Sequence, residues 1–233
     1  MENSSTTQKI LNFDPSTTIS ADFGIFGIPA EEKTSQVILL PVPWEVTTSY
    51  GAGASHGPTL IREASVQIDL FDLELGNAYE MGYFLKESSK EIEKLNFENK
   101  PKAQEVIRLR TELSDDQNKI NSLVSEVNLA CDQMTEWVYN ESKKIVAQKK
   151  VLGLIGGDHS TPLGAIKAVS EFFPKYSVLH IDAHADLRKS YQGFTQSHAS
   201  IMYNVMNLYN APQSLVQVGI RDFCQEEYDF IQQ

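Results

Sequence analysis

The sequence predicts an α/β protein in which a mainly parallel sheet carries helices on both faces, a three-layer α/β/α arrangement. The strands are expected at short apolar runs, namely 37–40, 151–155, 176–181 and 214–220. Stretches of helical character at 164–173 and 199–209 separate the last three runs. Strands that alternate with helices of about ten residues are typical of parallel sheets. A chain of 233 residues suits one large domain of this class.

The first strand, 37–40, is an uninterrupted apolar run that ends at prolines, as expected for a strand buried on both faces. The stretch TTSYGAGASHG then predicts a glycine-rich loop, and Pro58 suits the first turn of the helix that follows. Because the loop lacks the Gly-Lys-Ser/Thr ending of a phosphate-binding loop, we interpret its glycines as turn residues. His56, in the same loop, is interpreted as a structural histidine.

The middle of the chain divides into two parts. Residues 86–119 are highly charged and contain Pro101, which predicts a charged helical insertion made of exposed helix and linker. After it, apolar residues recur at intervals of three and four: Ile120, Val124, Val127, Cys131, Met134 and Val138. This spacing predicts one inward face of a core helix, so Met134 and Trp137 require no cofactor to explain them.

Composition limits the compartment and the partners. Residues 1–20 are expected to be a polar leader before a single domain at 21–233. These first residues are not a signal peptide, because they lack its apolar core. With no run of eighteen apolar residues and only two cysteines, the chain is expected to be cytoplasmic and not bound to a membrane. The net charge of −11 argues against nucleic acid as a partner. It is compatible with a cationic substrate, although a solvated acidic surface is the more common explanation.

Two polar clusters directly follow predicted strands: GGDHS at 156–160 and DAHADLR at 182–188. In open parallel sheets ligands bind beyond the carboxyl ends of the strands, and neighbouring strands are about 5 Å apart, so the two clusters are expected to converge. Alone, His159 is best explained as a loop histidine and the second cluster as a solvated strand end. Together, the carboxylates of Asp182 and Asp186, clustered with the imidazoles of His159 and His184, would repel and desolvate each other unless a cation neutralised them. The sequence therefore predicts a metal site.

The types of donor atom indicate which metal binds. Carboxylate oxygen and imidazole nitrogen without a thiolate disfavour structural zinc and suit a harder ion such as Mn²⁺. A bridging aspartate can hold two such ions about 3.5–4 Å apart, with a hydroxide between them.

GGDHS together with DAHADLR resembles the metal motifs of the ureohydrolase family, the arginases and agmatinases, which are binuclear manganese amidinohydrolases. The glycine-rich stretch that ends in GPTLIREA, GFTQSHAS at 193–200 and VGIRD at 218–222 are similar to further family segments. The wording around DAHADLR and SHAS is more similar to the agmatinase branch. The resemblance, which spans roughly residues 37–85 and 151–222, implies an arginase-like fold.

The resemblance also implies roles for individual residues. His159 and Asp186 would bind one manganese ion, Asp182 would bridge two, and His184 would bind the other. His198 matches the family histidine that passes protons to the departing amine, a role that suits an imidazole because its unperturbed pKa is near 6.5. Taken alone, His198 is better explained as a capping or packing residue.

The implied activity is manganese-dependent hydrolysis of a guanidino compound to urea and an amine, through a hydroxide that bridges two ions. Alternatives are a formimidoylglutamase- or guanidinobutyrase-type relative, or a catalytically impaired member that acts as a binding subunit. Asp158 would orient His159 or stabilise its own turn. Arg188 would bind a substrate carboxylate or pair with a surface acid. A homo-oligomer, trimer or hexamer, is also implied.

The sequence departs from the family after Asp186. The family motif S-x-D-x-D-x-x-D-P, which supplies two more aspartates, does not occur there. We therefore expect a chain that lacks its C-terminal part and the last strands of the sheet; the alternative is a complete but metal-poor protein. Because the metal site would then be open on one side, residues 1–233 alone are expected to bind manganese weakly and to release little or no urea.

Overall fold

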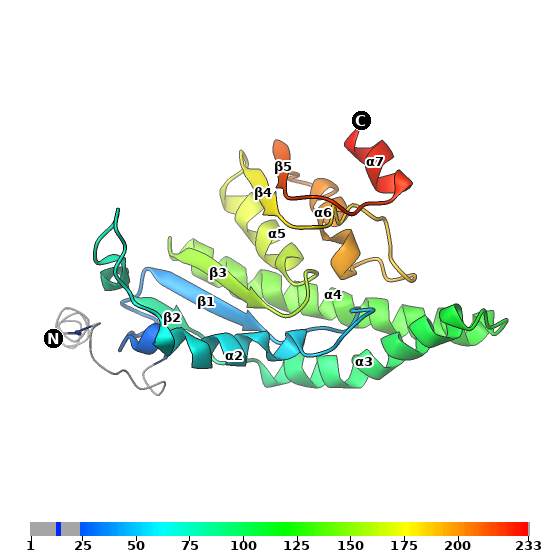
Figure 1. The fold of residues 1–233 in the computed structure, drawn as a ribbon, viewed down its shortest axis with the longest axis horizontal. Coiled ribbons are helices and arrows are strands. Elements are labelled where there is room, and N and C mark those ends of the chain that lie inside the picture. The colour runs from blue at the N-terminus through cyan, green and yellow to red at the C-terminus, as the bar shows by residue number, and fades with distance from the viewer. Residues whose placement is uncertain (1–12, 15–23, 233) are drawn as a thin grey trace.

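The computed structural model describes residues 13–14 and 24–232, so the predicted polar leader, apart from residues 13–14, lies outside the described residues. The strands are β1 (Val37–Val42), β2 (Tyr83–Leu85), β3 (Val151–Gly156), β4 (Ser177–Ile181) and β5 (Ser214–Val218). The α-helices are α2 (Gly57–Ala64), α3 (Lys90–Thr111), α4 (Gln117–Ala147), α5 (Pro162–Phe172), α6 (Ile201–Met206) and α7 (Gln225–Ile231). Figure 1 shows their arrangement.

The predicted strands and helices are present, with small changes at their ends. Four of the five strands match the predicted apolar runs. The strand β2 was not predicted, because a run of three residues is too short to show alternation. The helix α6 is shorter than the predicted stretch 199–209 and is preceded by a 3₁₀ turn at His198–Ser200. None of the described helices combines the length and the apolar character needed to cross a bilayer.

The strands form two parallel sheets rather than one. The first has the order β2-β1-β3, and the second pairs β4 with β5. The expectation that the strands before the two polar clusters are direct neighbours is therefore wrong, since no described hydrogen bond joins β3 to β4. Both sheets nevertheless direct the carboxyl ends of their strands toward one region, where the loops after β3 and β4 meet.

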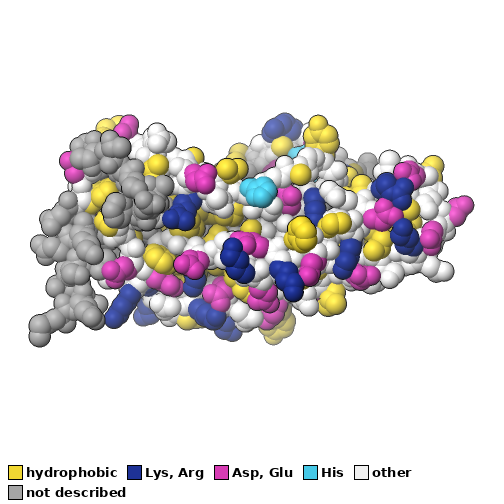
Figure 2. All heavy atoms as spheres, turned by 90° about the horizontal axis from the view of Figure 1, so that it is seen from below, with side chains coloured by type: hydrophobic (Ala, Val, Ile, Leu, Met, Phe, Trp, Pro, Cys, Tyr) yellow, Lys and Arg dark blue, Asp and Glu magenta, His cyan; other side chains and the backbone are white. Residues whose placement is uncertain are grey.

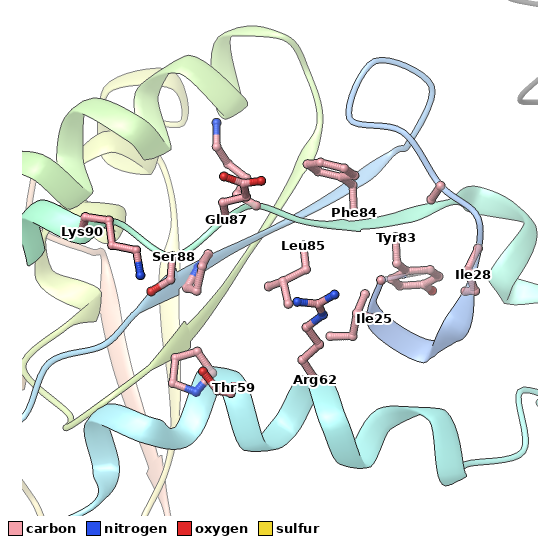
Figure 3. A pocket seen from close by; sticks show the side chains of 15 residues that line it. Ile25, Ile28, Thr59, Arg62, Tyr83, Phe84, Leu85, Glu87, Ser88 and Lys90 are labelled. Atoms are coloured by element: carbon pink, nitrogen blue, oxygen red, sulfur yellow. The ribbon is translucent and has the colours of Figure 1, made fainter. Parts of the chain in front are cut away.

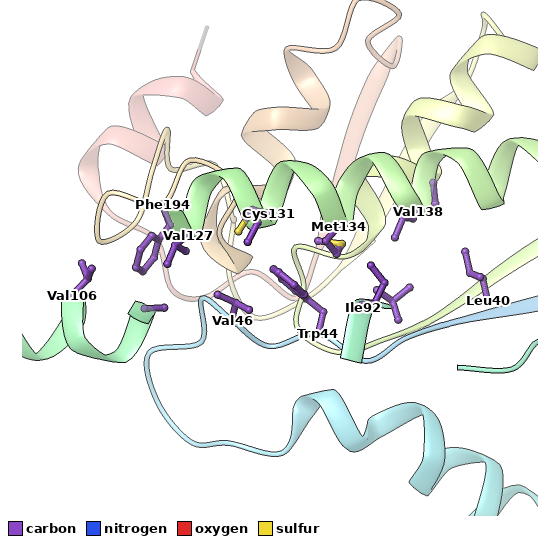
Figure 4. Packing of buried hydrophobic residues seen from close by; sticks show 14 of the residues in the cluster. Leu40, Trp44, Val46, Ile92, Val106, Val127, Cys131, Met134, Val138 and Phe194 are labelled. Carbon is purple, nitrogen blue, oxygen red and sulfur yellow. The ribbon is translucent and has the colours of Figure 1, made fainter. Parts of the chain in front are cut away.

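Helices cover both faces of the first sheet, as predicted. Ile38, Leu40 and Val42 of β1 pack in the main core with α3 and α4. On the other face, Pro41 and Pro58 of α2 line the same cavity. Figure 4 shows the main core, where residues of α4 such as Val127, Met134 and Val138 pack against the indole of Trp44 and against Ile92 of α3. The predicted inward face of the helix after Ile120 is buried, apart from Val124, which is partly exposed.

The helix α3 corrects the expectation of an exposed helix and linker at 86–119. It is continuous through Pro101 and buries one side in the main core, including Ile92, Ala103, Val106 and Leu109. Pro101 lies on the exposed side, where water can reach the carbonyl that the proline leaves without a partner. An internal proline costs about 3 kcal/mol, and burial of several apolar side chains at about 1.5–3 kcal/mol each outweighs it.

The remaining surface of α3 explains its high charge. Its exposed ion pairs follow helical spacing, such as Lys94 with Glu98 and Arg108 with Glu105 and Glu112. Figure 2, which views the molecule from the α3 side, shows acidic and basic side chains intermixed across this face. The charged residues of this segment therefore form the solvated face of the helix.

The second sheet is covered on one face only among the described residues. Its inward residues, such as Val178 and Leu215, pack in a smaller core with α5 and α6. The alternate residues are apolar and exposed: Leu179, Ile181, Val216 and Val218. An exposed apolar strand face of this kind favours association.

The loop after β1 and the loop after β3 make an unusually close backbone contact. The carbonyl oxygen of Trp44 accepts a hydrogen bond from the amide of Asp158 at 2.7 Å, and the amide of Gly157 donates to Val42 at 3.1 Å. A Cβ atom added to Gly157 would lie 1.8 Å from the Trp44 carbonyl oxygen. A glycine at 157 is therefore required for the approach of the two loops.

The loop after β1 is also fixed by a buried lysine of α3. The ammonium of Lys100 donates to the carbonyl oxygens of Glu45 at 2.7 Å and Thr48 at 3.3 Å, and also to the Thr48 hydroxyl. The Glu45 carboxylate in turn accepts from the amides of Gly53 and Ser55. Burial lowers the pKa of Lys100, while the charges of Glu45 and Asp158 act in the opposite direction. This helix thus holds the loop that borders the site described below.

We expect Gly157→Ala to reduce the free energy of unfolding by about 3 kcal/mol or more, because the clash is with backbone that cannot move aside. Gly153→Ala in β3 is the control: its closest contact is the end of the flexible Leu39 side chain. Its loss should be no more than about 1 kcal/mol. Chemical denaturation measures both. Equal losses would contradict the explanation.

We expect Lys100→Met to destabilise the protein by about 2–4 kcal/mol, because it leaves buried carbonyl oxygens without their charged donor. The loop at 45–55 should also become more accessible to proteases. Lys94→Met is a matched control on the exposed side of the same helix, with an expected change within about 0.5 kcal/mol. Denaturation curves and limited proteolysis test this, and the expectation fails if the two variants behave alike.

Candidate metal centre

Imidazole and carboxylate groups from the loops after β3 and β4 meet at one point. Nδ1 of His159 lies 2.7 Å from Oδ2 of Asp186 and 3.1 Å from Oδ2 of Asp182. Asp186 is buried, and His159 and Asp182 are partly buried. The structure thus brings together three of the four metal ligands predicted from the sequence.

Asp182 presents its two carboxylate oxygens to different histidines. Oδ2 is the oxygen near His159, whereas Oδ1 lies 3.5 Å from Nδ1 of His184 and accepts a hydrogen bond from the His184 amide at 2.9 Å. Each oxygen of the Asp182 carboxylate thus has a histidine nitrogen beside it.

His184, the fourth predicted ligand, lies at the rim of the site. Its side chain is 60% exposed, and its Nε2 lies 3.8 Å from Oδ2 of Asp222. A backbone bridge also pairs His184 with Asp222. Asp222 belongs to the VGIRD segment, which the sequence analysis did not assign a role.

His180 joins the site although it was not predicted. Donor atoms of His159, His180, Asp182 and Asp186 all lie within 4.8 Å of one another. The imidazole rings of His159 and His180 have centroids 5.1 Å apart. The signal was present in the sequence: His180 is in the predicted strand and Asp182, two residues later, directly follows it, so extended backbone directs both side chains to the same side.

Asp186 adopts an unusual backbone conformation. Its φ of 54° lies in the left-handed region, which aspartate tolerates better than most residues other than glycine. Its carbonyl oxygen accepts hydrogen bonds from the amides of Met202 and Tyr203 at the start of α6. These contacts hold the turn and so fix the position of the Asp186 carboxylate beside His159.

The charges of the cluster alter the ionisation of its members. Burial acts to lower the pKa of His159, but the hydrogen bond to Asp186 and the charges of Asp186, Asp182 and Asp158 together raise it above its ordinary value. Burial acts to raise the pKa of Asp182, but the His184 amide and the charge of His159 lower it. The cluster therefore stabilises positive charge at its centre.

The donor set fits a divalent cation. Two carboxylates converge on a single imidazole nitrogen, and no lysine or arginine is recorded in a salt bridge with either of them among the described residues. Oxygen and imidazole donors suit ions such as Mn²⁺, Fe²⁺ or Co²⁺. Without a cation, the carboxylates of Asp182 and Asp186 depend on a proton of His159 for positive charge. A cation at this position would neutralise them instead.

His198 lies beside this cluster. Its amide donates to the hydroxyl of Thr47 at 3.3 Å, its ring packs edge-on against Tyr191, and its Nδ1 is buried without a hydrogen-bond partner among the described residues. Burial lowers the pKa of His198, opposed by the carboxylates of Asp158 and Asp186. Burial therefore favours the neutral imidazole, the form that can accept a proton.

Asp158 stabilises its own turn. Its Oδ1 accepts hydrogen bonds from the Ser160 amide at 2.9 Å and from the Ser160 hydroxyl at 2.5 Å. Its Oδ2 lies 3.5 Å from the hydroxyl of Thr47. Of the two roles considered for this residue, the recorded hydrogen bonds correspond to the turn and include none to His159.

A cavity of about 420 Å³ opens onto the cluster. Its lining includes His184, Asp186, His198 and Tyr50, which is almost fully exposed on the loop held by Lys100. Arg188 also lines it. The Arg188 guanidinium lies over the ring of Tyr191 and has its Nε 3.5 Å from the buried carboxylate of Glu227. Arg188 is thus already paired with an acid.

A second cavity, of about 570 Å³, lies between α2 and β2 (Figure 3). Ile25, Ile28 and Leu85 contribute apolar walls, and Arg62 extends toward them from α2. Its described lining includes no histidine and no aspartate. His56 lines neither of these two cavities; it borders a third one beside Ser55 and Lys100 and is exposed at the start of α2, in keeping with a structural loop residue.

Known proteins are similar to this chain in both sequence and fold. The chain is 32% identical over 200 residues to the N(1)-aminopropylagmatine ureohydrolase of Synechocystis sp., an alignment that covers 84% of this chain and 54% of that protein. It is 27% identical over 198 residues to the agmatinase of Bacillus cereus, with 85% and 56% covered. The chain thus spans about half the length of these curated relatives.

Among solved structures, a putative agmatinase from Clostridium difficile superposes with a TM-score of 0.61 at 24% identity, over 87% of this chain and 60% of that one. This similarity establishes the arginase-like fold. The model of the arginase family matches residues 35–233, a range that contains β1, both polar clusters and the glycine-rich loop. The chain belongs to the arginase family.

Proposed function

We propose that His159, Asp182, His184 and Asp186 bind manganese and that the site hydrolyses a guanidino compound to urea and an amine, as in agmatinases. The observation that carries this proposal is the position of Asp182, whose two oxygens face two different histidines. The names of the relatives, agmatinase and N(1)-aminopropylagmatine ureohydrolase, support the class of substrate.

The residues divide into two groups in this proposal. His159 and Asp186 would hold one ion, His184 would hold the other, and Asp182 would contact both. Bound divalent cations supply Lewis acidity and lower the pKa of coordinated water. The protein contributes the positions of these donors, which are set by the strand end before Asp182 and by the left-handed turn at Asp186.

His198 is proposed to transfer the proton to the departing amine. It borders the same cavity as His184 and Asp186, and its buried Nδ1 has no hydrogen-bond partner among the described residues. Because burial lowers its pKa, the protonated imidazole is a stronger acid and releases its proton readily to a more basic amine.

The charge of the cavity favours a cationic substrate. Of the carboxylates in the lining, Asp186 is assigned to a metal ion and Glu227 engages the guanidinium of Arg188, which also lies over Tyr191, so that Asp222 is the carboxylate left to face a substrate. An acidic substrate, such as guanidinobutyrate or formimidoylglutamate, would require a free cation at the far end of the pocket. The agmatine type of substrate is therefore preferred over these alternatives.

The four donors do not complete two coordination shells, and a binding subunit with impaired catalysis is the second candidate. The feature that favours it is the exposure of His184, beside which Asp222 is the one further acid in the described part of the chain. A homo-oligomer, such as a trimer or hexamer, and a cytoplasmic location are proposed on the basis of the family resemblance and the composition alone.

We expect His159→Ala and Asp182→Ala to weaken Mn²⁺ binding by at least about 10- to 100-fold, the loss typical even of residues that only support ligands. Equilibrium dialysis followed by elemental analysis measures the bound metal. His56→Ala is the control, because this exposed loop histidine lies outside the cluster. Unchanged manganese binding in both site variants would reject the ligand assignment.

We expect the manganese-loaded chain to release urea slowly at best, and faster from agmatine than from guanidinobutyrate. These compounds share the guanidino group and differ in the charge at the other end, which the acidic cavity distinguishes. Long incubations with a colorimetric urea assay, with His159→Ala as the background, provide the measurement. A preference for guanidinobutyrate supports the acidic-substrate alternative, and manganese binding without any urea supports the binding subunit.

A further inference from the structure

His180 and Gln217 face each other across β4 and β5, and both side chains lie on the inward side of this sheet. Their neighbours on the same side, Val178 and Leu215, are apolar and pack in the smaller core. A polar pair in such a place costs free energy unless its groups are hydrogen bonded. Packing alone would favour apolar residues at these two positions.

Gln217 determines which nitrogen of His180 carries the proton. The side-chain nitrogen of Gln217 lies 2.8 Å from the carbonyl oxygen of Ala185 and 2.8 Å from Nδ1 of His180. A carbonyl oxygen can only accept, so the group that faces it is the amide NH₂. Its second hydrogen is then directed to Nδ1, which accepts. The neutral ring consequently carries its proton on Nε2.

The protonated Nε2 faces the metal ligands. It is buried, His180 being 4% exposed, and has no hydrogen-bond partner among the described residues. Oδ2 of Asp182 lies 3.4 Å away, somewhat longer than a well-formed hydrogen bond. A nitrogen that carries a proton has no free electron pair for a metal, so proximity to the cluster does not make His180 a ligand.

We infer that His180 is a positioning residue, which donates its Nε2 proton to Oδ2 of Asp182 while Gln217 maintains the required tautomer. This inference rests on the proposed function, in which Asp182 contacts both ions. With the His184 amide on Oδ1, the carboxylate then has one protein donor on each oxygen. Its rotation is limited, and its remaining electron pairs are left for cations.

The tautomer can be tested without metal. Long-range ¹H–¹⁵N correlation spectra of the metal-free chain distinguish the two nitrogens of each histidine. We expect His180 to carry its proton on Nε2, and Gln217→Met, which removes the donor at similar volume, to shift part of the population to Nδ1. A wild-type ring protonated on Nδ1, or a tautomer that does not respond to Gln217→Met, would overturn the inference.

Manganese affinity separates a positioning residue from a ligand. His180→Leu removes the donor and should weaken Mn²⁺ binding by about 10- to 100-fold. His180→Gln places an amide NH near the position of Nε2 and should restore affinity to within about 3-fold of wild type, because a donor rather than a ligand is needed. His56→Leu, in the exposed loop, should match wild type. If His180→Gln binds as weakly as His180→Leu, the inference is wrong.

The outcomes also separate this inference from the proposed function. If the wild-type chain binds Mn²⁺ no better than His159→Ala, the proposed metal site fails, and the tautomer measurement still decides the role of Gln217. If His159→Ala loses the metal while His180→Leu keeps wild-type affinity, the metal site stands and the positioning role of His180 is rejected.

Discussion

One imidazole nitrogen, Nδ1 of His159, lies between the carboxylates of Asp182 and Asp186, and the rest of the site depends on this convergence. Two anions so close together, one of them buried, repel unless positive charge lies between them. In the absence of metal, a proton on His159 provides it, which is why the carboxylates raise the pKa of that imidazole. A divalent cation provides more charge at the same place.

The backbone around the cluster is specialised to bring these groups together. Gly157 permits the loop after β3 to contact the carbonyl of Trp44, because a side chain at position 157 would clash with that carbonyl. Asp186 accepts a left-handed conformation, held by amides at the start of α6. Both features are energetically unfavourable for the backbone, and each lies in one of the two polar clusters. Unfavourable backbone conformations are found most often at functional sites.

The helix α3 links the core to the rim of the cavity. One side of it completes the main core, and Lys100 extends from that buried side to the loop that carries Thr48 and Tyr50. Since Thr47 of the same loop contacts both Asp158 and the amide of His198, the position of the loop is coupled to the turn that carries His159. The most highly charged segment of the chain thus also supports the site.

The sequence by itself determined four of the five described strands, the core helix after Ile120 and the two polar clusters, because period, run length and residue type are local properties. It also indicated which donors converge, through the rule that sites form at the carboxyl ends of parallel strands. Only the tertiary structure decided that β3 and β4 lie in separate sheets and that α3 is buried on one side. These depend on contacts between residues distant in sequence, such as Lys100 of α3 with the carbonyl oxygen of Glu45, and no local pattern encodes them.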